Sequence, residues 1–467
     1  MALCGQPDTR VLIRRCETYD RDILRRLVRQ GMRDLGFTPR GKVFVKPNVA
    51  FAGNGRYGCT AWTHTSVVGG SIQAICDFPE VGRADLGENM GIGFPTRMAY
   101  SYAGYYKEAK EVRRTARCPV SIFCIDEARR KEVFIGGRVH STLRVARKMA
   151  EADCKVYLPK LKCHCASVMT GAVKLNMGIC SDDERAIRHD FLLNDKIVDL
   201  LAAGYPDFVV MDAVDVGVGS EVVPTPRRLG LILMGRNPLA VDIVGARLLG
   251  HSVGEVPHLK RAVERGYGPA SPDDVTLLGD ITTLEELDCH ARRILPYDEE
   301  FRRWRDIGHE LELLGVPWRF VWGPSRTTDD EKCDSGCVMG LKIFLATLER
   351  YAGAELMKKA RPAFFIIGNP REEVDCGGHD AFIIGSCSNP VLVNAGKVVR
   401  IDRCFTTASD LLRILGFRLG RQVPVYDLRL LGSFVYFTFC AAMKKLVTLR
   451  YLQDFKYFMT KGFQQKI

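Results

Sequence analysis

Two clusters of cationic side chains each follow a short apolar segment of the chain. The first cluster follows residues 42–45, and the second follows residues 154–158. Because ligands of an open α/β sheet bind at the carboxyl ends of its strands, we expect both clusters to contribute to one site. Ammonium groups bind carboxylate or phosphate, and a lysine desolvated among like charges becomes a candidate base or nucleophile. The predicted catalytic residues are Lys46, Lys160, Lys162, His164, Lys174 and Asp212.

Other polar side chains are predicted to bind the substrate or to orient these lysines. The predicted substrate-binding residues are Asn48, Glu88, Arg185 and His189. Carboxylates at such an edge orient cations, bind a hard metal ion or act as acid and base. Asp212 is the best carboxylate candidate because it ends an apolar segment. Asp242 lies at the apolar start of a predicted helix, where helix capping or a buried ion pair is a competing interpretation of its role. Ordinary solvated lysines are the competing interpretation of the cationic set.

Four cysteines in the C-terminal third are predicted to hold a metal. Cys333 and Cys337 precede a predicted helix, and Cys387 and Cys404 follow apolar stretches. A helix N-terminus favours thiolates and an anionic cluster, so these residues predict a [4Fe–4S] cluster or, alternatively, a zinc ion. Cys376 is a substitute ligand, and scattered free thiols are the competing interpretation.

The run Cys163-His164-Cys165 is a weaker metal candidate. In an extended segment its two cysteines share one side and the histidine takes the other. The chain has 17 cysteines, and residues 1–15 lack the apolar core of a signal peptide. We therefore expect a cytoplasmic location and reduced thiols.

Strand-like and helix-like segments alternate along the first half of the chain, which predicts an α/β fold with a mostly parallel sheet and flanking helices. A smaller cysteine-containing α/β unit is expected near the C-terminus. The expected segments are an α/β domain at 1–283, a helical connector at 284–332, the cysteine-containing domain at 333–417 and a basic, aromatic tail at 418–467.

The formal net charge is +12, and nucleic-acid-binding motifs and long basic blocks are absent, so we expect no nucleic-acid partner. Residues 430–443 are uncharged but fall short of the roughly 18 residues of a membrane span. They predict a buried helix or an interfacial one, and residues 430–467 are a candidate for peripheral membrane contact.

Several motifs together resemble the family called domain of unknown function 362. They are Val-Lys-Pro-Asn at 45–48, Thr-His-Thr at 63–65, Pro-Lys-Leu-Lys-Cys-His at 159–164, Thr-Gly-Ala-Val-Lys-Leu-Asn-Met-Gly at 170–178, His189, Met-Asp-Ala at 211–213 and Ala-Val-Asp at 240–242. The resemblance spans roughly residues 10–255. It implies iron–sulfur ligands, which many members carry in a ferredoxin-like segment. This chain lacks the C-x2-C-x2-C-x3-C run, so a cluster here must use other cysteines.

Three functions remain open at this point. The first is a redox protein, which binds a small anionic substrate or cofactor, carries an iron–sulfur cluster and passes electrons to a partner. The second is a non-redox transferase, isomerase or hydrolase acting on an anionic substrate, with structural cysteines or zinc. The third is a membrane-surface binding protein.

Overall fold

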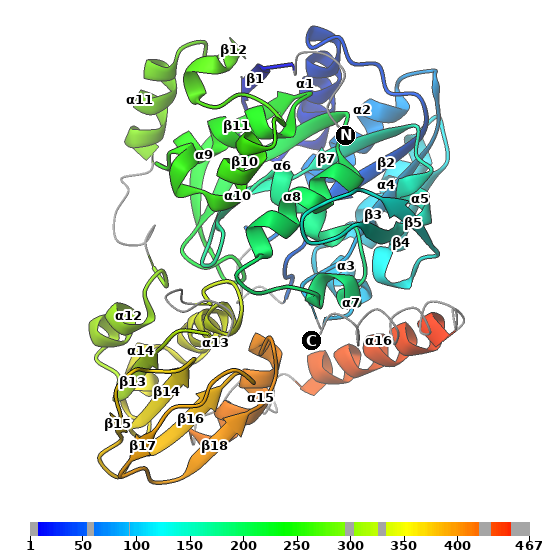
Figure 1. The fold of residues 1–467 in the computed structure, drawn as a ribbon. Coiled ribbons are helices and arrows are strands. Elements are labelled where there is room, and N and C mark those ends of the chain that lie inside the picture. Colours follow the sequence, from blue (N-terminus) through cyan, green and yellow to red (C-terminus); the bar gives the residue numbers. More distant parts are fainter. Residues whose placement is uncertain are drawn as a thin grey trace. The chain divides into compact units, whose positions relative to one another are not determined.

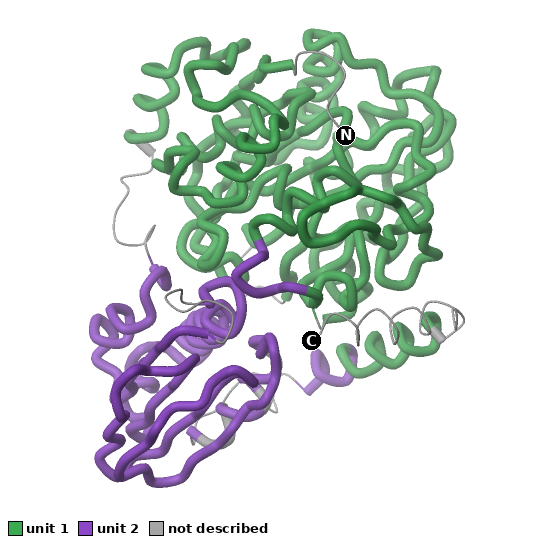
Figure 2. Tube along the Cα trace, viewed as in Figure 1, with its two compact units in different colours: residues 1–187, 194–301, 437–467 green, residues 188–193, 302–436 purple. Residues whose placement is uncertain are grey.

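The computed structural model describes residues 8–53, 60–92, 94–294, 303–325, 333–419 and 431–449 of the chain. The chain divides into two compact units, shown in Figure 2. Unit 1 comprises residues 1–187, 194–301 and 437–467, and unit 2 comprises residues 188–193 and 302–436.

A ten-stranded sheet forms the centre of unit 1 (Figure 1). In spatial order its main path is β12 (Thr276–Gly279), β1 (Arg10–Arg15), β11 (Thr225–Gly235), β10 (Phe208–Val218), β7 (Cys154–Leu158), β2 (Gly41–Pro47), β3 (Val81–Glu88) and β4 (Val120–Cys124). Off this path, β8 (Lys160–His164) pairs with β10, and β9 (Val168–Thr170) pairs with β8. Most neighbours on the main path run parallel, and β11 runs antiparallel to both β1 and β10. The expected mostly parallel α/β fold is confirmed.

Strands β1 and β2 follow each other in the chain and are joined by one helix. They run in the same direction, but β11, β10 and β7 lie between them. The reason is the long β10–β11 hairpin, whose second strand pairs with β1 along five residues. The pairing therefore depends on chain segments some 200 residues apart in the sequence, which local patterns do not encode.

Helices cover both faces of the sheet. Helix α1 (Arg21–Asp34), capped by the Asp20 side chain, packs against α2 (Thr65–Cys76), and a Cβ on its Gly31 would lie 2.5 Å from Sδ of Met234. On the opposite face, a Cβ on Gly245 of α9 (Pro238–Leu248) would lie 3.2 Å from Sδ of Met211. The remaining helices of unit 1 include α3 (Thr96–Tyr102), α4 (Tyr105–Thr115), α5 (Arg147–Ala150), α6 (Ala172–Leu175), α7 (Asp182–Ala186), α8 (Leu193–Gly204), α10 (Pro257–Glu264) and α11 (Leu284–Ile294).

Unit 2 contains a smaller parallel sheet. Its strands, in spatial order, are β13 (Trp318–Trp322), β14 (Ala363–Ile367), β16 (Asp380–Ile384) and β18 (Val398–Ile401). Helices α13 (Cys337–Ala352) and α15 (Ala408–Arg418) pack against each other. The stretch 284–332, expected as a helical connector, contains α11 and α12 (Ile307–Leu314) but also β13. The aromatic run Trp-Arg-Phe-Val-Trp suits a pleated strand better than a helix.

Helix α16 (Leu431–Leu449) lies in the region expected as a basic tail. Residues 420–430 and 450–467 of that tail lie outside the described residues. In the part that is described, no helix is both long and apolar enough to cross a membrane.

Candidate functional site

A group of buried charges in unit 1 lies at the carboxyl ends of β2 and β3, along β8 and in the middle of β10. We call it the lysine–carboxylate network and define it as Lys46, Lys160, Lys162, Lys174, Glu88, Asp212 and Glu221. The predicted clusters at the ends of β2 and β7 therefore lie in one region. Electrostatic contact between Lys162 and four other members, Lys160, Lys174, Glu88 and Glu221, supports this grouping. Asp212, expected at the end of a strand, is followed by six further residues of β10.

Lys46 and Glu88 form the first ion pair of the network. Nζ of Lys46, near the end of β2, lies 2.5 Å from Oε1 of Glu88, the last residue of β3, and both side chains are buried. Burial lowers the pKa of Lys46 and raises that of Glu88, while their mutual attraction opposes both changes. The carboxylate also accepts hydrogen bonds from the backbone N–H groups of Val49 and Asn89. The Glu88 carboxylate therefore has its partners within the protein, namely the Lys46 amine and two backbone N–H groups.

Lys160 and Asp212 form the second pair, which Tyr19 completes. Nζ of Lys160 lies 2.8 Å from Oδ2 of Asp212 and donates a hydrogen bond of 2.9 Å to the hydroxyl of Tyr19. That hydroxyl donates to Oδ1 of Asp212 at 3.1 Å. Burial raises the pKa of Tyr19, so the phenol stays protonated. His64 stacks on the Tyr19 ring at 3.7 Å between centroids, and its backbone N–H donates to Asp212.

Lys162 and Lys174 have pKa values near neutrality. Nζ of Lys162 donates to the carbonyl oxygens of Ala61 and Glu221, at 2.8 Å each. Burial lowers its pKa to about 7, against the opposing attraction of Glu221. Burial lowers the pKa of Lys174 to about 8. The other three lysines of the network are at most 1% exposed, whereas Lys174 is an intermediate, partly exposed residue.

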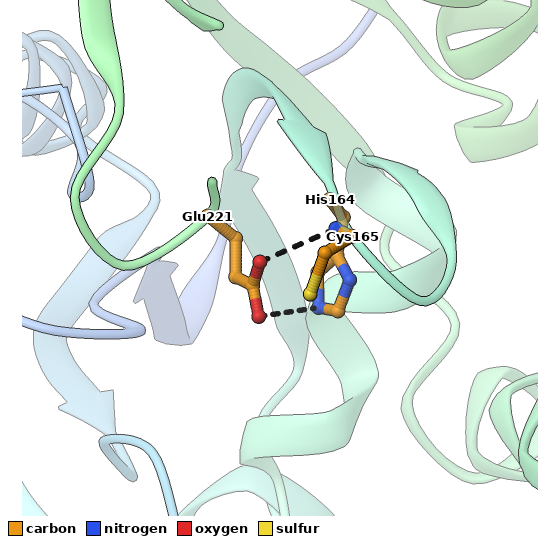
Figure 3. A group of neighbouring side chains, drawn as sticks. All are labelled: His164, Cys165 and Glu221. Atoms are coloured by element: carbon orange, nitrogen blue, oxygen red, sulfur yellow. Dashed lines mark hydrogen bonds and ion pairs between the residues drawn. The ribbon is translucent and has the colours of Figure 1, made fainter. Parts of the chain in front are cut away.

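His164, Cys165 and Glu221 form a compact group, shown in Figure 3. Among the described residues, this is the group of three His, Cys, Asp or Glu side chains whose possible ligand atoms all lie within 4.8 Å of one another. These residues are close enough to share one metal ion. However, Nδ1 of His164 accepts hydrogen bonds from the backbone N–H groups of Ala166 and Ser167, at 3.1 and 3.2 Å.

Because Nδ1 accepts these hydrogen bonds, it determines which ring nitrogen of His164 carries the proton. In a neutral imidazole one nitrogen accepts and the other carries the proton, so Nε2 of His164 carries it. Nε2 lies 3.9 Å from Oε1 of Glu221, and Oε2 of Glu221 accepts from the backbone N–H of Cys165 at 3.2 Å. A metal would need the Nε2 lone pair, so this arrangement suits proton transfer better than metal binding.

The remaining predicted residues of unit 1 have mainly structural contacts. Arg185 donates to the carbonyl oxygens of Asn89 and Met90 and pairs with Asp182. Asp242 accepts from the first N–H groups of α6, and burial raises its pKa to about 7 although those hydrogen bonds lower it. Asn48 differs, because its buried Oδ1 accepts no hydrogen bond from any described residue. This side chain is therefore available to a ligand.

In unit 2, backbone contacts bring together the segments that carry the four predicted cysteine ligands. Cys337 is the first residue of α13, and its Sγ accepts from the backbone N–H of Thr406 at 3.4 Å. A Cβ on Gly385 would lie 3.1 Å from the same sulfur, and a Cβ on Gly336 would lie 2.6 Å from Sγ of Cys333. Ser386 N–H donates to the carbonyl oxygen of Arg403, which joins the loops after β16 and β18.

The four thiols also affect one another's ionisation. Burial raises the pKa of Cys333 to about 12, and the charges of Cys337, Cys404 and Cys387 add to this rise. Burial likewise raises the pKa of Cys404 to about 11, with contributions from Cys337 and Cys387. We call Cys333, Cys337, Cys387 and Cys404 the cysteine quartet. It lies at the carboxyl ends of β16 and β18 and at the N-terminus of α13.

Two other predicted residues of unit 2 have clear positions. His189 stacks on Phe405 at 4.5 Å between centroids, and its Nδ1 lies 3.0 Å from the carbonyl oxygen of Ser335. His189, expected at the lysine site, thus adjoins the segments that carry Cys333 and Cys404. Cys376 is fully buried in an apolar cluster with Phe364 and Ile366, and its pKa responds to burial and Asp375 rather than to the quartet.

Sequence reasoning did not identify Tyr19 or the part that His64 plays beside it. Tyr19 comes just before α1, far from the clusters in the sequence, and no local pattern marks it. The Thr-His-Thr run at 63–65 was a signal for His64, and the neighbouring Thr63 donates through its hydroxyl to the carbonyl oxygen of Leu158 at 2.5 Å.

One comparison with known proteins matches part of the chain to a family model. Residues 43–247 match the family model described as domain of unknown function (DUF362). The structure of the lactate racemase apoprotein from Thermoanaerobacterium thermosaccharolyticum is similar at 12% sequence identity and a TM-score of 0.33, covering 79% of this chain and 70% of that chain. No curated protein matches the chain.

Proposed function

From the resemblance of residues 43–247 to the DUF362 family, we propose that this chain is an iron–sulfur redox protein that also binds a small anionic substrate or cofactor. In this proposal the cysteine quartet of unit 2 holds a [4Fe–4S] cluster. The lysine–carboxylate network of unit 1 binds the anion and handles its protons.

One observation carries the first half of the proposal, namely the gathering of four thiols from three separate segments. Sγ of Cys337 contacts the backbone of Thr406 and adjoins Gly385, so the loops of Cys404 and Cys387 both reach the start of α13. Four cysteines are the ligand set of a [4Fe–4S] cluster. Backbone N–H groups at the first turn of α13 favour the negative charge of such a cluster.

A single zinc ion is the alternative occupant of the quartet, because zinc also takes four thiolates. The resemblance to the DUF362 family, many of whose members carry iron–sulfur ligands, favours the cluster. When bound, the cluster would supply one-electron transfer.

The network of unit 1 has distinct roles for its members. Lys174, the least buried lysine of the network, is the proposed contact for the anion, and Oδ1 or Nδ2 of Asn48 adds a polar contact. The Lys160–Asp212 and Lys46–Glu88 pairs hold the surrounding strands in fixed positions. His164, with Nε2–H facing Glu221, is the proposed group that moves a proton.

The test is anaerobic purification of the full chain, followed by iron, zinc and sulfide analysis and a visible spectrum. We expect about four irons and four sulfides per chain in the native protein. Cys333→Ala should lose both the iron and the visible band. Cys376→Ala is the matched control, because it removes a buried thiol of the same unit outside the quartet. Zinc without sulfide, or iron retained in Cys333→Ala, would refute the cluster.

A second function has its own support in the near-neutral pKa values of Lys162 and Lys174, about 7 and about 8. Such groups suit general acid–base catalysis of a non-redox transfer, isomerisation or hydrolysis. The two functions differ in their need for the quartet. Once a reaction is found, activity that survives Cys333→Ala combined with Cys337→Ala and disappears in Lys174→Met would favour the non-redox function.

A further inference from the structure

A cationic cavity lies at the β4 edge of the unit 1 sheet, apart from the lysine–carboxylate network. Its volume is about 580 Å³, and six of the residues that line it are basic. These residues are Lys42, Arg83, Arg97, Arg129, Arg147 and Lys148. Phe123 also lines the cavity, and Nζ of Lys148 lies 4.8 Å from the centre of its ring.

Carboxylates balance only part of this charge. Arg97 pairs with Glu127 at 2.6 Å, and Arg147 lies 2.9 Å from Glu151. Arg83 and Lys148 share one partner, Asp85, at 2.7 and 2.8 Å. Lys42 and Arg129 are exposed side chains that add to the excess. A cavity with excess guanidinium and ammonium groups fits a phosphate-bearing ligand.

Helix α16 borders this cavity through Val447. Its inner face is bound to unit 1, where Phe437 meets Phe94 edge-to-face at 6.1 Å between centroids and Cys440 is 2% exposed. Nζ of Lys444 lies 2.8 Å from a carboxylate oxygen of Asp126 and 2.8 Å from one of Asp182. These two carboxylates raise the pKa of Lys444, so the anchor stays charged.

The outer face of α16 is apolar and exposed. Val435, Phe439 and Leu446 are 59%, 59% and 61% exposed, and their spacing of four and seven residues places them on one side of the helix. Buried helices do not present such a face to water, so the buried-helix interpretation of residues 430–443 is wrong for this side of α16. The sequence from Lys444 to Ile467 contains six Lys or Arg residues and one Asp.

We propose that α16 lies on an anionic phospholipid surface, with its apolar face among the acyl chains and a lipid phosphate group in the cationic cavity. An amphipathic helix with an apolar face and basic flanks binds at the membrane interface without spanning it. Lys444 anchors the helix to unit 1, so binding of the helix to the membrane holds the whole of unit 1 at the membrane surface. The excess positive charge around Val447 complements the negative charge of the lipid head groups.

The test is sedimentation of the full-length protein with vesicles of phosphatidylcholine alone or mixed with phosphatidylglycerol. We expect binding to the mixed vesicles that weakens as salt is added. Phe439→Ser combined with Leu446→Ser should reduce this binding at least tenfold. Leu313→Ser is the matched control, because Leu313 is a comparably exposed leucine of α12, and it should bind as the native chain does.

A second pair of variants separates the lipid from other occupants. Lys42→Gln combined with Arg129→Gln should remove most of the preference for phosphatidylglycerol while the fold, followed by circular dichroism, is unchanged. Suppose that the native protein sediments with neither kind of vesicle but binds inorganic phosphate in the cavity. This result would overturn the proposal in favour of a free anion as the ligand. A native dimer that Phe439→Ser dissociates, without vesicle binding, would overturn it in favour of a second copy of the chain.

Discussion

Lys160 and Asp212 form an ion pair in which Nζ and Oδ2 are 2.8 Å apart, although both side chains are almost fully buried. The two residues lie opposite each other in the parallel register of β8 and β10, so strand pairing itself brings the charges together. The hydroxyl of Tyr19 bridges them. This lysine is therefore a fixed part of the site rather than a solvated surface charge.

Removing one charge of this pair should strongly destabilise unit 1. Lys160→Met leaves Asp212 buried without its counter-charge, which costs about 3–5 kcal/mol of unfolding free energy. Lys160→Met combined with Asp212→Leu should recover much of this loss, because neither charge is then left alone. Urea unfolding followed by circular dichroism measures both changes.

The control for this prediction is the exposed pair of Arg114 and Glu111, with side chains 62% and 36% exposed. Arg114→Ala should cost less than about 1 kcal/mol. If Lys160→Met costs no more than Arg114→Ala, the buried pair does not hold the strands in position.

The Lys46–Glu88 pair should be sensitive to one methyl group added at Gly178. A Cβ there would lie 2.1 Å from Oε1 of Glu88 and 2.7 Å from Nζ of Lys46, so the pair must move. We expect Gly178→Ala to cost about 1–3 kcal/mol of unfolding free energy. Gly254→Ala, where the nearest atom is 4.0 Å from the added carbon, should be close to neutral. Equal effects of the two variants would contradict the close contact.

The lowered pKa of Lys162 predicts how stability changes with pH. Its folded-state pKa is about 7, whereas an unfolded lysine has a value of about 10.4. Between these values the unfolded chain binds more protons, so the contribution of Lys162 to stability rises with pH from about 7 upward. Lys162→Met should flatten this rise in the free energy of unfolding, and Lys260→Met, at an exposed position of α10, should not. An unchanged slope in Lys162→Met would show that the amine titrates normally.

Anion binding in unit 1 should depend on the protonation of Lys174. With a pKa of about 8, its amine loses its positive charge as the pH rises through that value. Sulfate, whose own charge is constant in this range, should bind more weakly above pH 8 in calorimetric titrations. Lys174→Met should bind sulfate weakly at every pH, whereas Lys260→Met should match the native chain. Sulfate affinity that is independent of both pH and Lys174 would place the anion elsewhere.

Local patterns predicted the strands that end at the site but not the partners of its charges. The apolar runs of β2, β7 and β14 and the stripe of α1 are visible in the sequence, and the structure contains these elements. The pairing of Lys160 with Asp212 depends on the register of two strands about 50 residues apart, and Tyr19 reaches that pair from the far end of the chain. Burial of Lys46, Lys160 and Lys162 is likewise a tertiary property, because the sequence alone fits solvated lysines equally well.

The four cysteines show the same difference between local patterns, which the sequence reveals, and tertiary contacts, which it does not. Their placement before a helix and after two strands could be predicted from the sequence, because each position follows a local change of pattern. The burial of Cys376 in an apolar cluster could not be predicted, because it depends on packing against Phe364 and Ile366. The strand β13 was also missed, since its short aromatic run lies within a stretch rich in Arg and Glu.

The most direct test of the central claim is an electron paramagnetic resonance spectrum of the anaerobically purified, dithionite-reduced protein. We predict the signal of a reduced [4Fe–4S] cluster in the native chain, in Cys376→Ala and in Cys165→Ser, and its loss in Cys333→Ala. A native protein that contains zinc, or no metal, and gives no such signal would contradict the claim. The function would then rest on Lys174 and the network around it.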